Sequence, residues 1–491
     1  MKQFRIVILI TVALLISIAT GCGPSEPQPI TVGLIKDGVF DPEEWGKVYP
    51  LEYESWLKTK EPKPTGKTRY KRGWDTDEVI YDKLSEFPYT ALLYSGWGFG
   101  VEYNEPRGHY YAVKDQIDVD PSRTKPGGVC LACKSPYHKT LTEKKGMEYL
   151  TAQFKDALTM IPAKMRETGP ACIDCHKNDT MGLTTNKPHI SRGLAMLGKK
   201  DVSRQEARTL ACAQCHITYY VPRDRDKKVA GDATPPWTGS SWGDISIENI
   251  IKDLCTDYRR IEWKQKVTGF DMPYIRHPEF EMFSRGSIHW KAGVACADCH
   301  MPYRRAGSYK ISDHDVTSPL KADLRACAQC HTESASWLKD QVFAIQDRTV
   351  SLLNRAGYAA AAAAKLFELA HARRDAGTAV DQALYEKARN CYMQSFLRIA
   401  FVGAENSCGF HNPPEAGRIL GDAIAFSYKA EALLRQALAA AGVGVPESTN
   451  LELTKYLNNR GEKKLNFKRE QEFKDPFDIE KYFTPDGAKG Y

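Results

Sequence analysis

The chain has 491 residues, among them 14 cysteines and 12 histidines, and a formal net charge of +7. With 42% hydrophobic and 26% charged residues it has the composition of a folded globular protein, which excludes a disordered or fibrous one. No run of lysine and arginine is long enough to form a nucleic-acid-binding arm, so we expect no nucleic acid partner. The placement of the cysteines is the most informative feature of the sequence.

Residues 1–22 have the features of an export signal. An apolar run from 6 to 18 follows two basic residues and is too short to span a bilayer comfortably. Cys22 is placed like the lipidated cysteine of a bacterial lipoprotein, although Ala19 stands where leucine is usual. Plain cleavage is the main alternative, and an uncleaved anchor helix is less favoured. We expect a periplasmic protein that is anchored by lipid at Cys22, with residues 23–39 as a tether.

Ten cysteines form five Cys-x-x-Cys pairs. The pairs are Cys130/Cys133, Cys172/Cys175, Cys212/Cys215, Cys296/Cys299 and Cys327/Cys330. Four pairs are followed at once by a histidine: His176, His216, His300 and His331. The first pair is followed by Lys134. A single Cys-x-x-Cys-His is expected by chance about 0.01 times in such a chain, so the repetition indicates function.

Three kinds of site could use these cysteines. Disulfides suit an exported protein but do not explain a histidine after each pair. Zinc sites use such pairs, but an adjacent histidine rarely turns back onto the same tetrahedral ion. Covalent haem c uses all three residues, because two thiols bond to the porphyrin and the histidine ligates the iron. We therefore predict haem c, and intervals of 42, 40, 84 and 31 residues between motif starts place the haems in one compact body.

Lys134 in the first motif indicates a haem with a different role. A lysine must lose a proton to ligate iron, and both burial and coordination favour that loss. A haem with histidine on both faces carries electrons, whereas a haem with lysine on one face and no fixed ligand on the other binds a substrate. The sequence therefore predicts one reaction centre that receives electrons from four closed haems. The alternative is a disulfide at this pair and a surface lysine.

Four closed haems need four second ligands from the eight histidines outside the motifs. His371 lies in an alanine-rich helical run and is a candidate surface residue. His138 and His189 have no special context, and such histidines are more often structural than ligands. The residues alone leave the choice of second ligands open. The eight candidates are His109, His138, His189, His277, His289, His314, His371 and His411.

One Cys-x-x-Cys-Lys followed by four Cys-x-x-Cys-His closely resembles the pentahaem cytochrome c nitrite reductases, the ammonia-forming family. The resemblance covers about residues 40–445. Matching stretches are PRGHYYAV (106–113), QCHITYYV (214–221), HPEFEMF (277–283), SIHW (287–290), ADCHMP (297–302), SDHD (312–315) and GFHNPPE (409–415). The resemblance implies a mainly α multihaem cytochrome c with a haem-packed core, five covalent haem c groups and reduction of nitrite to ammonium.

The same resemblance implies a ligand for each iron. The implied proximal ligands of haems 1 to 5 are, in order, Lys134, His176, His216, His300 and His331. The implied distal ligands of haems 2 to 5 are, in order, His314, His109, His411 and His289.

Three further residues are implied above haem 1: Arg123, Tyr219 and His277. Arg107 is the alternative to Arg123, because the loop before the first motif varies in length. A guanidinium holds the nitrite anion, a phenol donates a hydrogen bond, and a histidine of near-neutral pKa delivers protons. Outside this context, a tyrosine or histidine in such positions is more often structural.

Thr218 and Arg276 depart from the family pattern. Most members bind calcium beside the active haem, through a glutamate just before the tyrosine and a glutamine just before the histidine. Here a carboxylate is lost and a cation gained, so calcium would lack oxygen ligands and be repelled. We expect that Arg276 replaces calcium, as in the calcium-independent branch of the family. The alternative is calcium held by backbone carbonyls and other side chains.

Residues 336–445 are predicted to form long helices. Ala359–Ala364 is a strong helix-forming run, Gly377 marks a break, and further helices are expected at about 381–405 and 414–441. Cys391 lies on an apolar stripe and is predicted to be buried. The family uses such helices in a homodimer, and we expect the same.

The predicted organisation has three further parts. Residues 40–335 form the pentahaem catalytic region with few strands, 336–445 the dimerisation region, and 446–491 a charged tail along the surface. A disulfide between Cys255 and Cys408 is a less favoured possibility.

Two functions remain in competition. The first is an enzyme that reduces nitrite, with electrons from a membrane multihaem quinol dehydrogenase; nitric oxide, hydroxylamine and sulfite are alternative substrates of the family. The second is an electron-transfer cytochrome without reductase activity. Lys134 favours the enzyme, because an electron carrier needs no open iron.

Overall fold

A computed structural model describes residues 33–63, 66–73, 80–461 and 466–479. The predicted signal peptide, Cys22 and most of the tether lie outside these residues. Within the described part of the chain, no helix is both long and apolar enough to cross a membrane.

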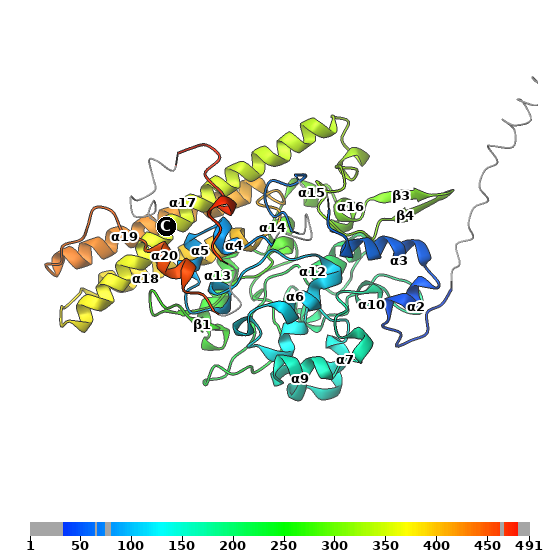
Figure 1. Cartoon of the computed structure of the whole chain (residues 1–491), viewed down its shortest axis with the longest axis horizontal. Helices are drawn as coiled ribbons and strands as arrows, with labels where there is room; N and C mark the ends of the chain where they lie inside the picture. Colours follow the sequence, from blue (N-terminus) through cyan, green and yellow to red (C-terminus); the bar gives the residue numbers. More distant parts are fainter. Residues whose placement is uncertain (1–32, 64–65, 74–79, 462–465, 480–491) are drawn as a thin grey trace, which may run out of the picture.

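Helices and loops make up most of the described chain, as predicted for a mainly α protein (Figure 1). Short 3₁₀ segments connect the helices of the first three hundred residues. The α-helices of this part are α2 (Pro42–Gly46), α3 (Pro50–Leu57), α4 (Lys83–Glu86), α5 (Tyr89–Leu93), α6 (Ala112–Asp118), α7 (His138–Lys145), α8 (Met147–Thr151), α9 (Phe154–Thr159), α10 (Cys172–Cys175), α11 (Pro188–Met196), α12 (Arg204–Ala213), α13 (Ile247–Thr256), α14 (Glu279–Ser284), α15 (Ile288–Lys291) and α16 (Cys296–His300).

The strands form two small antiparallel hairpins. In the first, β1 (Trp263–Lys264) pairs with β2 (Asp271–Met272), and Trp263 lies opposite Met272. In the second, β3 (Tyr303–Ala306) pairs with β4 (Tyr309–Ser312), and Tyr303 lies opposite Ser312. This scarcity of strands agrees with the prediction for the haem-bearing region.

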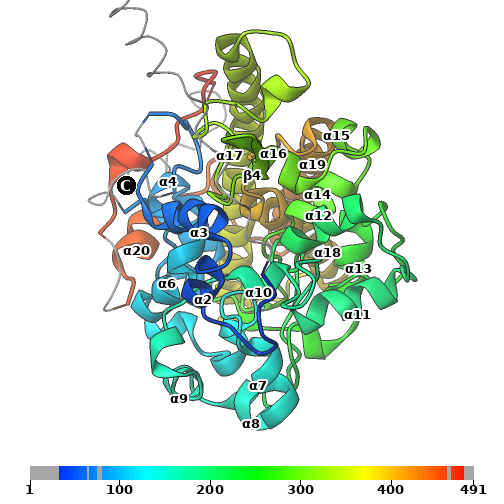
Figure 2. The ribbon, with the colours of Figure 1, turned by 90° about the vertical axis from the view of Figure 1, so that its right-hand side faces the viewer.

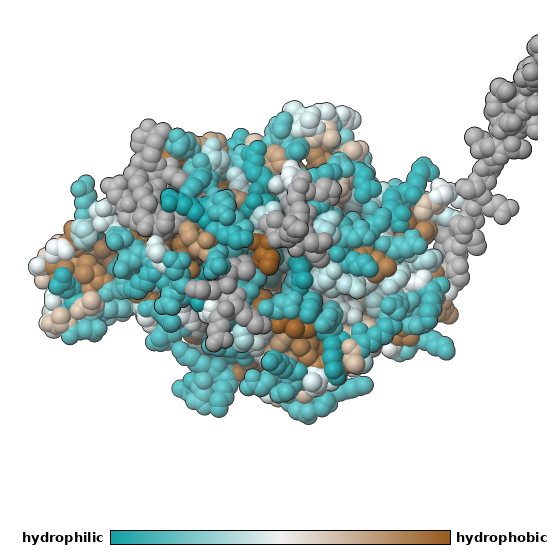
Figure 3. All heavy atoms as spheres, viewed as in Figure 1, coloured by the Kyte–Doolittle hydropathy of each residue, from teal (hydrophilic) through white to brown (hydrophobic). Residues whose placement is uncertain are grey.

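Three long helices, α17 (Ala335–Asp375), α18 (Gln382–Ala404) and α19 (Pro413–Ala440), form a bundle at one end of the molecule (Figures 1 and 2). They match the predicted helices to within a few residues. Ser334 accepts a hydrogen bond from the Trp337 amide at 3.2 Å and caps α17. Gly377 follows α17 with φ of +88°, a left-handed conformation that favours glycine. Figure 3 shows hydrophobic residues gathered at the left, over the free end of this bundle.

The alanine run Ala359–Ala364 does more than favour a helix. All six residues are buried, so their small side chains let neighbouring elements approach α17 closely. The same face carries Gly357, where an added Cβ would lie 2.1 Å from the ring of Tyr89 on α5. Tyr89 is held there by a hydrogen bond from its hydroxyl to the Leu353 carbonyl at 3.2 Å.

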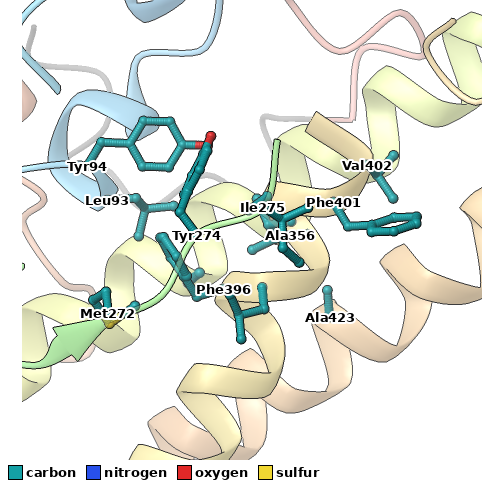
Figure 4. Packing of buried hydrophobic residues seen from close by; sticks show 14 of the residues in the cluster. Leu93, Tyr94, Met272, Tyr274, Ile275, Ala356, Phe396, Phe401, Val402 and Ala423 are labelled. Atoms are coloured by element: carbon teal, nitrogen blue, oxygen red, sulfur yellow. The ribbon is translucent and has the colours of Figure 1, made fainter. Parts of the chain in front are cut away.

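The largest hydrophobic cluster joins the bundle to the rest of the protein (Figure 4). It contains Phe396 on α18, Ala423 on α19, and Tyr94 and Tyr274 from the preceding region. The two tyrosines meet edge to face, and their hydroxyls are hydrogen-bonded at 3.1 Å. Cys391 belongs to this cluster, as predicted.

The segment after Thr449 is packed more firmly than its charge predicts. Helix α20 (Leu453–Asn458) buries Leu453 and Leu457 in the main hydrophobic cluster. Arg460 then forms an ion pair with Asp82 at 3.0 Å, with both side chains almost fully buried. Apolar residues spaced for a short helix therefore dock this part of the tail on the body of the protein, close to α4 (Figure 2).

Candidate active site

All ten cysteines of the five motifs line one cavity of about 2930 Å³. Pockets for a single small molecule are about 300–1,000 Å³, so this cavity has room for several large groups. Each motif lies on a short element at the cavity wall, such as α10 for the second motif and α16 for the fourth. The cysteines are free thiols, as covalent attachment to porphyrin requires.

Eight histidines face one another across this cavity in four pairs. Each pair joins a motif histidine to one from a distant part of the chain. The ring centres are separated by 6.2 Å for His176 and His314, 6.2 Å for His216 and His109, 6.3 Å for His300 and His411, and 6.4 Å for His331 and His289.

These separations match the space that one metal ion needs between two imidazoles. A metal bonded to two facing imidazoles at about 2.0 Å from each nitrogen holds the ring centres about 6.3 Å apart. The pairs are those implied by the family resemblance for haems 2 to 5. The residues present therefore fit bis-histidine haem c at four positions, although the ligation itself remains a prediction.

The Nδ1 nitrogen of several of these histidines forms a hydrogen bond with the protein. The Nδ1 atoms of His176, His300 and His314 each donate to a backbone carbonyl at 2.9 Å. A carbonyl can only accept, so Nδ1 carries the proton and the Nε2 lone pair is left for a metal. This arrangement, in which the remote nitrogen is fixed by the protein, is typical of metal-bound histidine.

Two of the paired histidines have carboxylate partners instead. His411 Nδ1 lies 2.6 Å from Glu405, which is fully buried and also accepts from Ser407 and Gly409. Burial would raise the pKa of Glu405, but contacts with His411 and Ser407 hold it below its usual range. His216 Nδ1 lies 3.6 Å from the buried Glu279. Negative charge therefore lies beside two of the four predicted closed irons.

A buried lysine ties the first three motifs together. Lys187 Nζ lies 2.8 Å from Asp174 in the second motif and donates to the Ser135 carbonyl, just after the first motif, at 2.7 Å. Gln214 of the third motif donates to the Asp174 carbonyl and accepts from the Asn186 amide, both at 2.7 Å. These contacts fix the relative positions of three cofactor-binding segments.

Lys134 lines the cavity together with Arg123, Tyr219 and His277. Arg123 is the last residue of the 3₁₀ segment Pro121–Arg123. Its Nη1 donates a hydrogen bond to the Glu102 carbonyl at 3.0 Å. Its Nε is buried and has no hydrogen-bond partner among the described residues. Arg107 is instead engaged by carboxylates, including that of Asp118 at 3.0 Å. This geometry favours Arg123 over Arg107 as the anion-binding arginine.

Tyr219 packs against the same buried hydrophobic cluster as Cys130 and Cys133 of the first motif. His277 is held at φ of +43°, a strained conformation for a residue other than glycine, and its side chain is half-exposed. Its Nδ1 lies 3.9 Å from Glu279, the same carboxylate that contacts His216. One buried carboxylate thus contacts both a predicted catalytic histidine and a predicted haem ligand.

Arg276 is fixed directly beside Tyr219. Its guanidinium donates to the Tyr219 carbonyl at 3.1 Å and to Glu262 at 2.7 Å, and its amide donates to Thr218 Oγ1 at 3.1 Å. The Arg276 and Glu262 side chains are 10% and 2% exposed. A buried cation therefore binds the backbone oxygen next to a predicted catalytic side chain.

The remaining histidines have protein partners. His138 contacts Tyr149 and Asp232 at 3.1 and 3.0 Å, and His189 contacts the Gln214 carbonyl at 2.6 Å. His371 contacts the Tyr385 hydroxyl at 2.6 Å. Cys255 is exposed and Cys408 buried, and both are free, so the possible disulfide between them does not form.

Sequence reasoning missed three acidic residues of this site. Glu279 and Glu405 lie close in sequence to His277 and His411, and that proximity is a signal that could have identified them. Glu262 carries no comparable signal, because its role depends on the β1–β2 hairpin that brings it to Arg276.

These motifs, histidine pairs and cavity define a multihaem cytochrome c. The family model described as cytochrome c552 matches residues 41–484, and the chain belongs to this family. A cytochrome c-552 of Desulfotalea psychrophila is 32% identical over 425 residues, covering 82% of this chain and 76% of that protein. The cytochrome c nitrite reductase subunit NrfA of Nitratidesulfovibrio vulgaris is 30% identical over 441 residues, covering 84% and 81%.

The fold is also that of a solved cytochrome c nitrite reductase. The catalytic subunit from Desulfovibrio desulfuricans, described for its two calcium sites, superposes with a TM-score of 0.71 and 28% identity, covering 82% of this chain and 88% of that one. The predicted likeness to the pentahaem nitrite reductases is confirmed. The individual ligands, the catalytic residues and the calcium-independent branch remain predictions.

Proposed function

We propose that this chain reduces nitrite to ammonium by six-electron transfer at a lysine-ligated haem c. The relatives described as nitrite reductases support the reaction. The observation that carries the proposal is an asymmetry within one cavity. Four motif histidines each face a second histidine across the cavity, whereas the first motif carries Lys134 in place of a histidine.

Five haem c groups are proposed, bound by the ten motif cysteines. Haem bound at these residues would supply electron-carrying irons at the four histidine pairs and, at Lys134, a fifth iron at which nitrite could be reduced. Lys134 is the proposed protein ligand of that fifth iron.

Arg123, Tyr219 and His277 are the proposed catalytic residues. The Arg123 guanidinium is proposed to bind the anion, because the residue lines the cavity that also contains Lys134. The Tyr219 hydroxyl stays protonated and can donate a hydrogen bond, because burial raises its pKa. His277 can pass protons to the departing oxygen atoms, and the Glu279 carboxylate lies 3.9 Å from its Nδ1.

Arg276 is proposed to take the place of calcium. Calcium would bind backbone and carboxylate oxygens here, and the Tyr219 carbonyl and Glu262 are both engaged by the Arg276 guanidinium. These residues do not fit a calcium site, so the protein is expected to work without that ion. Metal analysis tests this directly: one stoichiometric calcium, lost together with activity on chelation, would refute it.

Other parts of the proposal rest on the sequence. We infer a homodimer formed through the long helices of residues 336–445, a catalytic region at 40–335, and a periplasmic protein anchored through Cys22. A membrane multihaem quinol dehydrogenase is the proposed electron donor.

Anaerobic turnover with reduced viologen tests the function. We expect one ammonium for each nitrite and six electrons consumed, and parallel assays with hydroxylamine, nitric oxide and sulfite rank the substrates. A high-spin haem signal beside low-spin signals supports the enzyme. Five low-spin haems and no ammonium would establish the alternative, an electron-transfer cytochrome without reductase activity.

A further inference from the structure

A group of buried polar side chains lies behind Arg123. The extended segment 102–105 runs beside α4: the Lys83 amide donates to the Tyr103 carbonyl at 2.8 Å, and the Glu105 amide to the Tyr81 carbonyl at 2.8 Å. This pairing places acidic, basic and phenolic side chains side by side. We call the following five side chains the polar passage: Glu86, Lys83, Glu105, Tyr103 and Arg123.

The passage leads from near the surface towards Arg123. At its outer end, the partly exposed Arg72 donates to Glu86 at 2.8 Å. Lys83 Nζ lies 3.8 Å from the Glu105 carboxylate and 5.0 Å from the centre of the Tyr103 ring. The Arg123 guanidinium lies 5.8 Å from the same ring centre.

Several polar atoms along the passage are buried without a hydrogen-bond partner among the described residues. They are Glu86 Oε2, Glu105 Oε1, Asn104 Oδ1 and Arg123 Nε. The side chains of Glu86 and Glu105 are only 1% and 3% exposed. Native proteins almost always satisfy such atoms, and ordered water does so where protein groups do not. These unpartnered atoms, together with a space of about 20 Å³ lined by Lys83 and Tyr103, point to bound water within the passage.

The charges around the passage favour a group that exchanges protons near neutral pH. Burial, and then the charge of Glu105, raise the pKa of Glu86 to about 8 despite Arg72 and Lys83 nearby. Lys71, Tyr94 and Cys408 also face the Lys83 end of this cluster, and Glu102, Tyr274 and Cys130 face Arg123. Proton donors work best when their pKa lies near the working pH.

We propose that the polar passage, together with bound water, delivers protons to the nitrite site. The inference rests on the proposed function, because nitrite reduction is what consumes the protons. One nitrite takes up eight protons and six electrons and yields one ammonium and two waters. The reduced donor supplies the electrons through the haems, so the protons need a separate route from solvent to a buried site.

Glu105→Gln and Glu86→Gln test the passage, because glutamine keeps the shape and removes the exchangeable proton. We expect an unchanged KM for nitrite, a fall in kcat of about tenfold and a larger solvent deuterium isotope effect. In the wild type, kcat should fall as pH rises through about 8, where Glu86 loses its proton, and Glu86→Gln should remove that limb. Tyr103→Phe, which keeps the ring, should also lower kcat.

Asp475→Asn is the matched control. Asp475 is a buried carboxylate that accepts from Ser351 at 2.7 Å and lies outside the cavity lining, so its variant should keep the wild-type kcat and pH profile. Infrared difference spectra give a readout apart from activity. The band of protonated carboxyls that disappears near pH 8 in the wild type should be weaker in Glu86→Gln, where only Glu281, whose pKa burial also raises to about 8, supplies it.

The outcomes separate the two proposals. If the wild type forms ammonium while all three passage variants keep its kcat, isotope effect and pH profile, the passage is refuted and the function stands. Altered haem potentials with an unchanged pH profile would also refute it, since the side chains would then serve the haems. If the wild type forms no ammonium, the function fails, and an infrared band that is unchanged in Glu86→Gln would additionally refute the passage.

Discussion

Replacing Arg276 by glutamine should expose how much the site depends on this guanidinium. The substitution leaves the Glu262 carboxylate, 2% exposed, without its cation. Removing one member of a buried ion pair costs about 3–5 kcal/mol of stability. A glutamine amide can still donate to the Tyr219 carbonyl, which recovers about 1 kcal/mol. We therefore expect Arg276→Gln to lower the free energy of unfolding by about 2–4 kcal/mol.

Urea unfolding followed by haem absorbance, together with nitrite turnover, measures this loss with and without calcium. Glutamine is the family's calcium-site residue here, so added calcium should restore stability, and more strongly when Thr218→Glu is combined with it. Calcium at 100 times its dissociation constant contributes about 2.7 kcal/mol. The control Glu262→Gln breaks the same pair but keeps the cation, so calcium should not rescue it. An Arg276→Gln protein with wild-type stability and activity in the absence of calcium would refute the reasoning.

Three other predictions follow from the described contacts. Lys134→His should lower nitrite-dependent viologen oxidation at least tenfold, because axial-ligand identity sets the reactivity of a haem iron; full activity would contradict the proposed ligand. Glu281 accepts a hydrogen bond from Trp237, and burial raises the pKa of its carboxyl to about 8. Between pH 4.5 and 8 the folded state therefore holds a proton that the unfolded state has lost, so the free energy of unfolding should fall as the pH rises through this range. Glu281→Gln should flatten that fall between urea midpoints measured at pH 5 and pH 8, and an unchanged slope would count against it. Gly357→Ala should lower the free energy of unfolding in urea by about 1–3 kcal/mol, because the added Cβ would meet the Tyr89 ring. An unaltered urea midpoint would contradict that packing.

The parts of this fold that could be predicted are those with local signals. The bundle helices are bounded by a serine cap, Gly377 and Gly442, all readable from neighbouring residues. The five motifs are also local, because both thiols and the next residue serve one haem. The docking of the tail was not predictable, since the Arg460–Asp82 pair joins residues hundreds of positions apart.

The same distinction applies to the site. The spacing of the histidines in the sequence could not show which of them face each other, because each pair depends on how distant loops fold back on the cavity. Only the family resemblance implied the pairs that the structure brings together. Glu262 was missed for the same reason. Its importance lies in a partner fourteen residues away across a small hairpin.

The single large cavity also constrains the order of assembly. Protein interiors tolerate few voids, so we expect that a chain whose ten motif cysteines line a space of about 2930 Å³ needs its prosthetic groups to hold this shape. Porphyrins must accordingly be joined to the thiols while the polypeptide is still open, and collapse then follows around them. A strain that exports this protein but cannot ligate haem should accumulate no folded precursor, only a protease-sensitive chain.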